Sequence, residues 1–202
     1  MLKWKFDALL ILIKFHFNLL LGKIFGITYV IRYIRNPDPI ITVKLLREFG
    51  AKIGERTTIK RTIYLDNVYE DKNSIGDFSN LKIGINCYIG DCAYFDLSNE
   101  IIIGNNVVIS GGVSFVTHAD CNRSVYLEKV FPRKCKKIVV QDGAWIGFKA
   151  TILNGVTIKR NSVVAAHSLV KKDVEEYCFY AGLPAEKIRN IKDSHTIADI
   201  PE

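Results

Sequence analysis

The chain has 202 residues, 49% of them hydrophobic, and carries a net charge of +7 at pH 7. This length supports one folded core rather than two. The five cysteines are odd in number and lack paired metal-ligand spacing, which argues against a disulfide framework or a zinc site. We therefore expect no metal, a reducing compartment and a cytoplasmic protein.

Residues 1–49 form a basic, apolar segment that we expect to be helical. Residues 1–61 hold twelve Lys/Arg against four Asp/Glu, so the other 141 residues carry sixteen against seventeen. Apolar runs at 8–13, 15–21 and 24–31 are separated by basic residues. No uninterrupted run reaches the roughly 20 apolar residues that a transmembrane helix needs.

Two interpretations of residues 1–35 remain open from composition. The segment is either an interfacial helix or helical hairpin on the inner face of an anionic membrane, or a helix packed on the domain that follows or on neighbouring subunits. Nucleic acid is not an expected partner, because the basic residues lie inside apolar runs. Residues 40–49 have helical spacing and end at Gly50, a plausible stop.

A six-residue repeat follows and predicts the fold of residues 50–181. Aliphatic residues begin each repeat near the end of this region, at Val140, Ile146, Ile152, Ile158, Val164 and Val170. Weaker or shifted copies begin at Ile53, Ile83 and Ile103, and a loop at 116–138 interrupts them. Period six fits one flat face of a triangular coil with roughly eighteen residues a turn, which is a parallel β-helix.

Four features together give a specific resemblance over residues 50–192. They are the repeats, a histidine-bearing loop at Val116-Thr117-His118-Ala119-Asp120, the motif Gly143-Ala144-Trp145-Ile146-Gly147, and a tail at Gly182-Leu183-Pro184-Ala185-Glu186-Lys187-Ile188-Arg189. In these features the chain resembles the hexapeptide-repeat acetyltransferases, in the branch that contains galactoside, maltose, nodulation-factor and polysaccharide O-acetyltransferases.

The resemblance implies an all-β fold, a left-handed parallel β-helix, assembled as a homotrimer with active sites between adjacent subunits. We expect a tail with a short helix over residues 182–202. The implied reaction is direct acetyl transfer from acetyl-CoA, without a covalent enzyme intermediate.

His118 is the expected general base. A hydroxyl is a poor nucleophile until a base removes its proton, and a neutral imidazole suits that task near neutral pH. Its other ring nitrogen needs an acceptor that fixes the tautomer. Asp120, Asp96 or a backbone carbonyl could provide that acceptor.

The resemblance also assigns the donor contacts. The positions that match the family's coenzyme A contacts are Trp145, Gly147, Ala166, Lys171, Lys172 and Arg189. Trp145 could instead anchor an interface, and the two lysines could lie in a solvated turn. Phe148 stands where galactoside-type enzymes carry a serine, so only a backbone N–H remains there as an oxyanion donor.

The expected function is O-acetylation of a saccharide, such as a capsule, lipopolysaccharide or exopolysaccharide precursor. The family's acceptor-contacting asparagine falls near Gly90, which indicates a different sugar from that of galactoside-type enzymes. The basic apolar N-terminus favours a lipid-linked acceptor. The alternatives are N-acetylation of an amino-sugar nucleotide, O-acetylation of a drug, or a non-catalytic hexapeptide scaffold.

Overall fold

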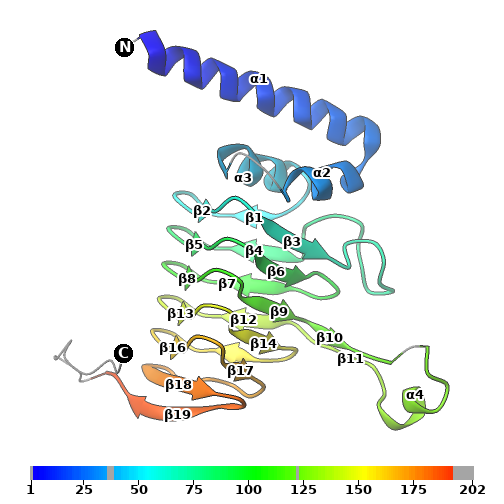
Figure 1. Ribbon diagram of the computed structural model, residues 1–202, viewed down its shortest axis with the longest axis vertical. Helices are drawn as coiled ribbons and strands as arrows, with labels where there is room; N and C mark the ends of the chain where they lie inside the picture. Colours follow the sequence, from blue (N-terminus) through cyan, green and yellow to red (C-terminus); the bar gives the residue numbers. More distant parts are fainter. Residues whose placement is uncertain (1, 36–38, 122, 193–202) are drawn as a thin grey trace.

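The computed structural model describes residues 2–35, 39–121 and 123–192. Three helices lie at one end of a coil of short strands (Figure 1). They are α1 (Leu2–Phe25), α2 (Ile27–Tyr33) and α3 (Pro39–Glu48), and a short fourth helix, α4 (Leu127–Val130), lies in an excursion from the coil.

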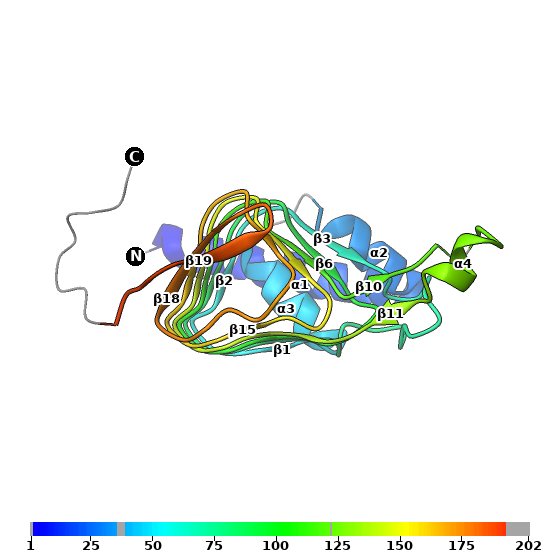
Figure 2. The same cartoon turned by 90° about the horizontal axis from the view of Figure 1, so that it is seen from below.

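The strands form three parallel sheets, one for each face of the coil, which we call faces A, B and C. Face A contains β1 (Lys52–Ile53), β4 (Leu81–Ile83), β7 (Ile101–Ile103), β12 (Ile138–Val140) and β15 (Thr157–Ile158). Face B contains β2 (Thr58–Ile59), β5 (Tyr88–Ile89), β8 (Val108–Ile109), β13 (Trp145–Ile146), β16 (Val163–Val164) and β18 (Cys178–Gly182). Face C contains β3 (Ile63–Asp66), β6 (Ala93–Asp96), β9 (Ser114–Val116), β14 (Thr151–Leu153) and β17 (Leu169–Val170). Figure 2 looks along the coil and shows the successive turns superimposed, so the predicted parallel β-helix is confirmed.

The repeat positions stack into buried columns, one inside each face. On face B the strand register aligns Ile59, Ile89, Ile109, Ile146 and Val164, each at most 1% exposed. On face C, Phe95 and Phe115 occupy the column and stack with ring centroids 5.3 Å apart. The burial of one large apolar side chain per face and turn stabilises the coil.

The corners of the coil use left-handed backbone conformations. Asn86, Asn106 and Asn161 have φ values of 57°, 55° and 51°, in the region that asparagine tolerates better than most residues. His167 also lies at a corner, with φ of 57°.

The helices cover the first turn of the coil. Ile41, Leu45 and Leu46 of α3 are fully buried there. Helix α1 contacts α2 and α3 and lies outermost (Figure 1). One stretch of it, Asp7–Phe25, is long and apolar enough to cross a membrane, with a mean hydropathy of 1.8. The helix continues through the lysines that separate the apolar runs. Together these runs therefore reach the length of a membrane-spanning helix, which no single run reaches.

The expected short helix in the C-terminal tail was wrong for the residues that the structure describes. There β19 (Ala185–Asn190) turns back and pairs antiparallel with β18, which itself pairs with β16. Pairing with the last strand of face B satisfies backbone groups at the end of the coil, and this tertiary contact outweighs the helical preference of Ala185, Glu186 and Lys187. Residues 193–202 lie outside the described part of the chain.

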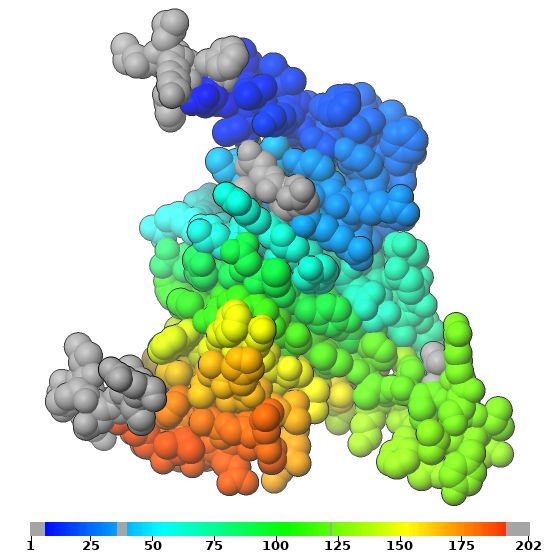
Figure 3. Space-filling model, in the orientation of Figure 1, coloured from blue at the N-terminus to red at the C-terminus, as the bar shows by residue number. Residues whose placement is uncertain are grey.

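A long hairpin leaves the coil after face C. Strands β10 (His118–Ala119) and β11 (Lys134–Cys135) pair antiparallel and carry α4 beyond them. In Figures 1 and 3 this hairpin stands away from the body of the coil.

Candidate functional site

His118 lies where the chain leaves the coil. Face C ends at Val116, Thr117 is fully buried, and His118 opens the hairpin opposite Cys135. The His118 side chain is 24% exposed. One end of the ring is therefore held by the coil while the rest of it remains accessible.

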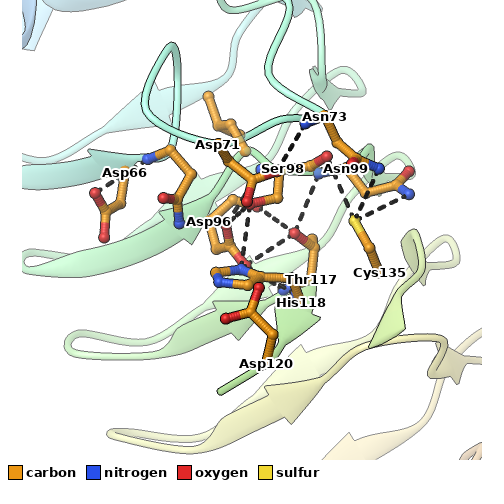
Figure 4. Close-up of polar contacts among 12 residues, drawn as sticks. Asp66, Asp71, Asn73, Asp96, Ser98, Asn99, Thr117, His118, Asp120 and Cys135 are labelled. Atoms are coloured by element: carbon orange, nitrogen blue, oxygen red, sulfur yellow. Dashed lines mark hydrogen bonds and ion pairs between the residues drawn. The ribbon is translucent and has the colours of Figure 1, made fainter. Parts of the chain in front are cut away.

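Asp96, at the end of β6, is a fully buried carboxylate beside this histidine. Its Oδ2 lies 2.7 Å from His118 Nδ1 and accepts the backbone N–H groups of Thr117 at 2.8 Å and His118 at 3.0 Å (Figure 4). Its Oδ1 accepts hydrogen bonds from Asn67 Nδ2 at 2.9 Å and Ser98 Oγ at 2.8 Å. These donors compensate the buried charge.

The protonation of this pair follows from its contacts. Burial raises the pKa of Asp96, but the hydrogen bonds from His118, Asn67 and Ser98 outweigh burial and lower the pKa to about 2. An ionised carboxylate only accepts hydrogen bonds, so His118 Nδ1 carries a proton. The lone pair of Nε2 is then available to a substrate.

Asp96, and not Asp120, therefore holds His118 Nδ1, which corrects the role predicted for Asp120. The Asp120 carboxylate pairs with Arg133 Nη1, and Arg133 Nη2 lies 2.6 Å from Asp71 Oδ1. A carboxylate oxygen of Asp71, a carboxylate oxygen of Asp120 and a ring nitrogen of His118 all lie within 4.8 Å of one another. Asp120 thus remains next to His118, in an ion-paired cluster.

Three of the predicted coenzyme A contacts lie on face B and the corner after it. Trp145 and Ala166 are exposed, and Trp145 Nε1 donates a hydrogen bond to Ser110 Oγ at 3.3 Å. Gly147 is buried, and a Cβ on it would lie 2.5 Å from the backbone nitrogen of Ala166. The close approach of adjacent turns therefore requires a glycine at this position.

The other three predicted contacts lie elsewhere. Arg189 is in β19, opposite Phe179. Lys171 and Lys172 follow β17, at the same corner as His118 but two turns further along the coil. Within one chain, the six residues do not converge on one point.

Phe148 lies at the corner between faces B and C, whereas His118 lies beyond the far end of face C. The Phe148 carbonyl accepts the His167 N–H at 2.8 Å. Among residues 2–35, 39–121 and 123–192, the Phe148 N–H has no hydrogen-bond acceptor. The width of face C separates this N–H from the His118 ring of the same chain.

Sequence reasoning missed several residues of this site. Asn67 and Ser98 fix the Asp96 carboxylate, while Asp71 and Arg133 belong to the cluster beside His118. Arg133 and Asp71 are 62 residues apart, in two different excursions from the coil. No local spacing signals such a pair.

Acetyltransferases are among the known proteins that the chain resembles. No family model matches the chain. The galactoside O-acetyltransferase of Escherichia coli strain K12 is 33% identical over 154 residues, covering 74% of this chain and 68% of that protein. The galactoside O-acetyltransferase of Lactococcus lactis strain IL1403 is 29% identical over 160 residues, covering 78% and 71%. A hexapeptide-repeat containing acetyltransferase of Vibrio cholerae, complexed with acetyl coenzyme A, matches with a TM-score of 0.65 and 27% identity, over 77% of this chain and 79% of that one.

Proposed function

Because the chain belongs to the hexapeptide-repeat acetyltransferases, we propose that it transfers the acetyl group of acetyl-CoA to a saccharide hydroxyl, with His118 as general base. Membership of this family makes the chain an acyltransferase, and the alternative of a non-catalytic scaffold loses its support. The observation that carries the mechanism is the 2.7 Å contact between His118 Nδ1 and the buried Asp96.

His118 Nε2 removes the proton of the acceptor hydroxyl while its oxygen attacks the thioester carbonyl carbon. A C–O bond forms, the C–S bond breaks, and the imidazolium returns its proton to the departing sulfur. The products are an acetyl ester and a free thiol. Asp96 keeps Nδ1 protonated and stabilises the transient imidazolium.

The outer surface at the corner between faces B and C suits the donor, which when bound supplies an activated acetyl thioester. Ala166 and Trp145 are exposed there, and Gly147 brings the backbone close to the surface. Small residues there let an extended pantetheine arm form hydrogen bonds to the backbone. Lys171 and Lys172, which suit its phosphates, lie across face C in the same chain, so in a cyclic trimer they would reach this donor from a neighbouring subunit.

A homotrimer would complete the active site. In one chain, face C separates His118 from the N–H of Phe148, which has no acceptor among the described residues. In a cyclic trimer, the corner that bears Phe148 of one subunit meets the corner that bears His118 of the next. The Phe148 N–H then donates to the carbonyl oxygen on which negative charge develops.

The acceptor that we propose is a lipid-linked saccharide at the inner face of a membrane. Eight large apolar residues of α1 are between 40% and 65% exposed: Leu9, Leu10, Leu12, Ile13, Phe17, Leu20, Ile24 and Phe25. Lys14, Lys23, Arg32 and Arg35 are exposed on or near the same helix. Exposed apolar residues combined with cations are typical of a helix that docks on an anionic bilayer.

The test is acetyl-CoA turnover, followed as thiol release, against sugars, nucleotide sugars and lipid-linked glycans. We expect turnover that depends on a saccharide acceptor, and a loss of at least about 100-fold in kcat for His118→Ala. His16→Ala, a change of an exposed histidine on α1, serves as control. Turnover that survives His118→Ala would overturn the proposed base, and turnover with amino-sugar nucleotides alone would identify N-acetylation instead.

A further inference from the structure

The Phe148 side chain is an exposed ring that its neighbours hold in place at the corner between faces B and C. It is 48% exposed, and it meets the His167 ring edge-on, with ring centroids 5.8 Å apart. Lys149 Nζ lies over the Phe148 ring, 5.2 Å from its centroid. Edge-to-face aromatic pairs and cation–π contacts both stabilise such an arrangement. Acetyl transfer as proposed uses only the backbone N–H of Phe148, so the ring has no task in it.

The ring also lies against the preceding turn of the coil. Gly111 occupies the same corner one turn earlier, because β8 and β13 pair in register. A Cβ on Gly111 would lie 3.5 Å from Cε2 and 3.6 Å from Cδ2 of Phe148. The Phe148 ring therefore covers the Gly111 backbone, while His167 contacts it from the following turn. Contacts with both adjacent turns fix the position of the ring.

The proposed path of the donor leads to this ring. The pantetheine arm that passes over Ala166 and Gly147 brings the thioester oxygen to the Phe148 N–H, at a hydrogen-bond distance of about 2.9 Å. Only two covalent bonds separate the Phe148 nitrogen from Cβ. The acyl carbons attached to that oxygen therefore lie beside the ring. The space over Gly111, one turn further in the same direction, is already filled by the ring itself.

We infer that the Phe148 ring limits the size of the acyl group, so that the enzyme transfers acetyl and discriminates against propionyl and longer chains. The inference rests on the proposed function and deepens it, because it concerns the donor of the same reaction. An added methylene overlaps the ring or forces it away from Gly111 and His167. A site of fixed size discriminates one methylene by roughly 10-fold to 200-fold. A smaller side chain at this position keeps the N–H and opens the space.

The test compares acetyl-, propionyl- and butyryl-CoA as donors for full-length wild type, Phe148→Ala and Phe148→Leu, with the saccharide that supports thiol release. The ratio of kcat/KM between donors measures acyl size, since any general effect on the site cancels in it. In wild type, propionyl-CoA should be at least about 10-fold poorer than acetyl-CoA. In Phe148→Ala this ratio should fall to within about 3-fold, and Phe148→Leu should give an intermediate ratio.

Tyr177→Ala is the matched control. It also removes a ring that lies under a cation, Lys192 Nζ at 5.6 Å, but at the corner between faces A and B, where Tyr177 N–H donates to Arg160 O. This variant should keep the donor ratio of wild type. Isothermal titration calorimetry of the same three donors, without acceptor, should rank them in the same order for each protein.

Wild type that uses and binds propionyl-CoA as well as acetyl-CoA would overturn the inference. So would a wild-type donor ratio in Phe148→Ala and Phe148→Leu, once circular dichroism and light scattering show that both are folded and assembled like wild type. Absence of saccharide-dependent turnover in wild type would instead overturn the proposed function. The binding ratios of wild type and Phe148→Ala would then decide the inference on their own.

Discussion

The Asp96 carboxylate holds both the His118 ring and the backbone that carries it. One oxygen meets His118 Nδ1 and also accepts the N–H groups of Thr117 and His118. The ring and its peptide are thus fixed by a single buried group. Because the ring cannot turn without breaking this contact, Nε2 keeps one direction toward the substrate.

Asp96→Asn is expected to lower kcat by about 100-fold to 10,000-fold, because an amide can donate to Nδ1 and so favour the wrong tautomer. The measurement is steady-state kcat together with the KM for acetyl-CoA, which should change little. Asp120→Asn should keep most of kcat, because Asp120 pairs with Arg133 rather than with His118 Nδ1. An equal loss of kcat in Asp120→Asn, with Asp96→Asn active, would return the orienting role to Asp120.

The low pKa of Asp96, about 2 against an ordinary value of 3.8, also links this residue to stability. A carboxylate with a lowered pKa stabilises the folded state above its unfolded pKa, and this stabilisation is lost as the pH falls from about 4 to about 2. The difference in pKa corresponds to about 2 kcal/mol. The free energy of unfolding of wild type, minus that of Asp96→Asn, should shrink by this amount between pH 6 and pH 2. A difference that does not vary with pH would contradict the assignment.

The sequence predicted His118 because one histidine follows a repeat and precedes a long interruption of the pattern. It also offered Asp96 as one of several acceptors, since this residue lies one turn earlier. Asp71 and Arg133 were not predictable, because their contact depends on how two excursions fold back toward each other. Local spacing carries information about residues within one turn of the coil and little about contacts between its loops.

Among the secondary-structure elements, the coil was predictable and the C-terminal hairpin was not. The coil repeats one apolar position every six residues, and each repeat buries its side chain in the same column. Strand β19 is mostly exposed, with no buried residue, so no apolar pattern marks it. Its conformation depends on the open edge that β18 presents.

A substitution at Gly147 tests whether this glycine is needed for the packing of adjacent turns or for the binding of acetyl-CoA. A Cβ at Gly147 would lie 2.5 Å from Ala166 N, while one at Gly111 would lie 3.1 Å from its nearest atom, Asp91 O. Gly147→Ala should therefore lower the free energy of unfolding by about 1–3 kcal/mol, and Gly111→Ala by less. Thermal or urea unfolding measures both. If Gly147→Ala weakens acetyl-CoA binding without loss of stability, the glycine serves the donor alone.

At the scale of the whole molecule, the three helices give one end of the coil a surface with many exposed apolar side chains and cations. We expect full-length protein to co-sediment with vesicles that contain phosphatidylglycerol, less with pure phosphatidylcholine, and less at high salt. Phe17→Gln with Ile24→Gln should reduce this binding, because both side chains are about 60% exposed on α1. Val125→Gln with Tyr126→Gln changes exposed apolar residues of the distant hairpin and serves as control. Equal binding by both double variants would place the membrane contact elsewhere.

Assembly decides whether the active site is complete. If each site uses His118 of one subunit and the Phe148 N–H of the next, His118→Ala and Phe148→Pro should each be inactive alone, since proline lacks the N–H. Co-expression should restore part of the activity, because every mixed cyclic trimer contains one interface with both groups intact. Mixing His118→Ala with Asp96→Asn should restore none, because both changes affect the same side of every site. Light scattering must show three-chain particles in each sample. Failure of the first mixture to recover activity, with trimers present, would place the complete site within a single chain.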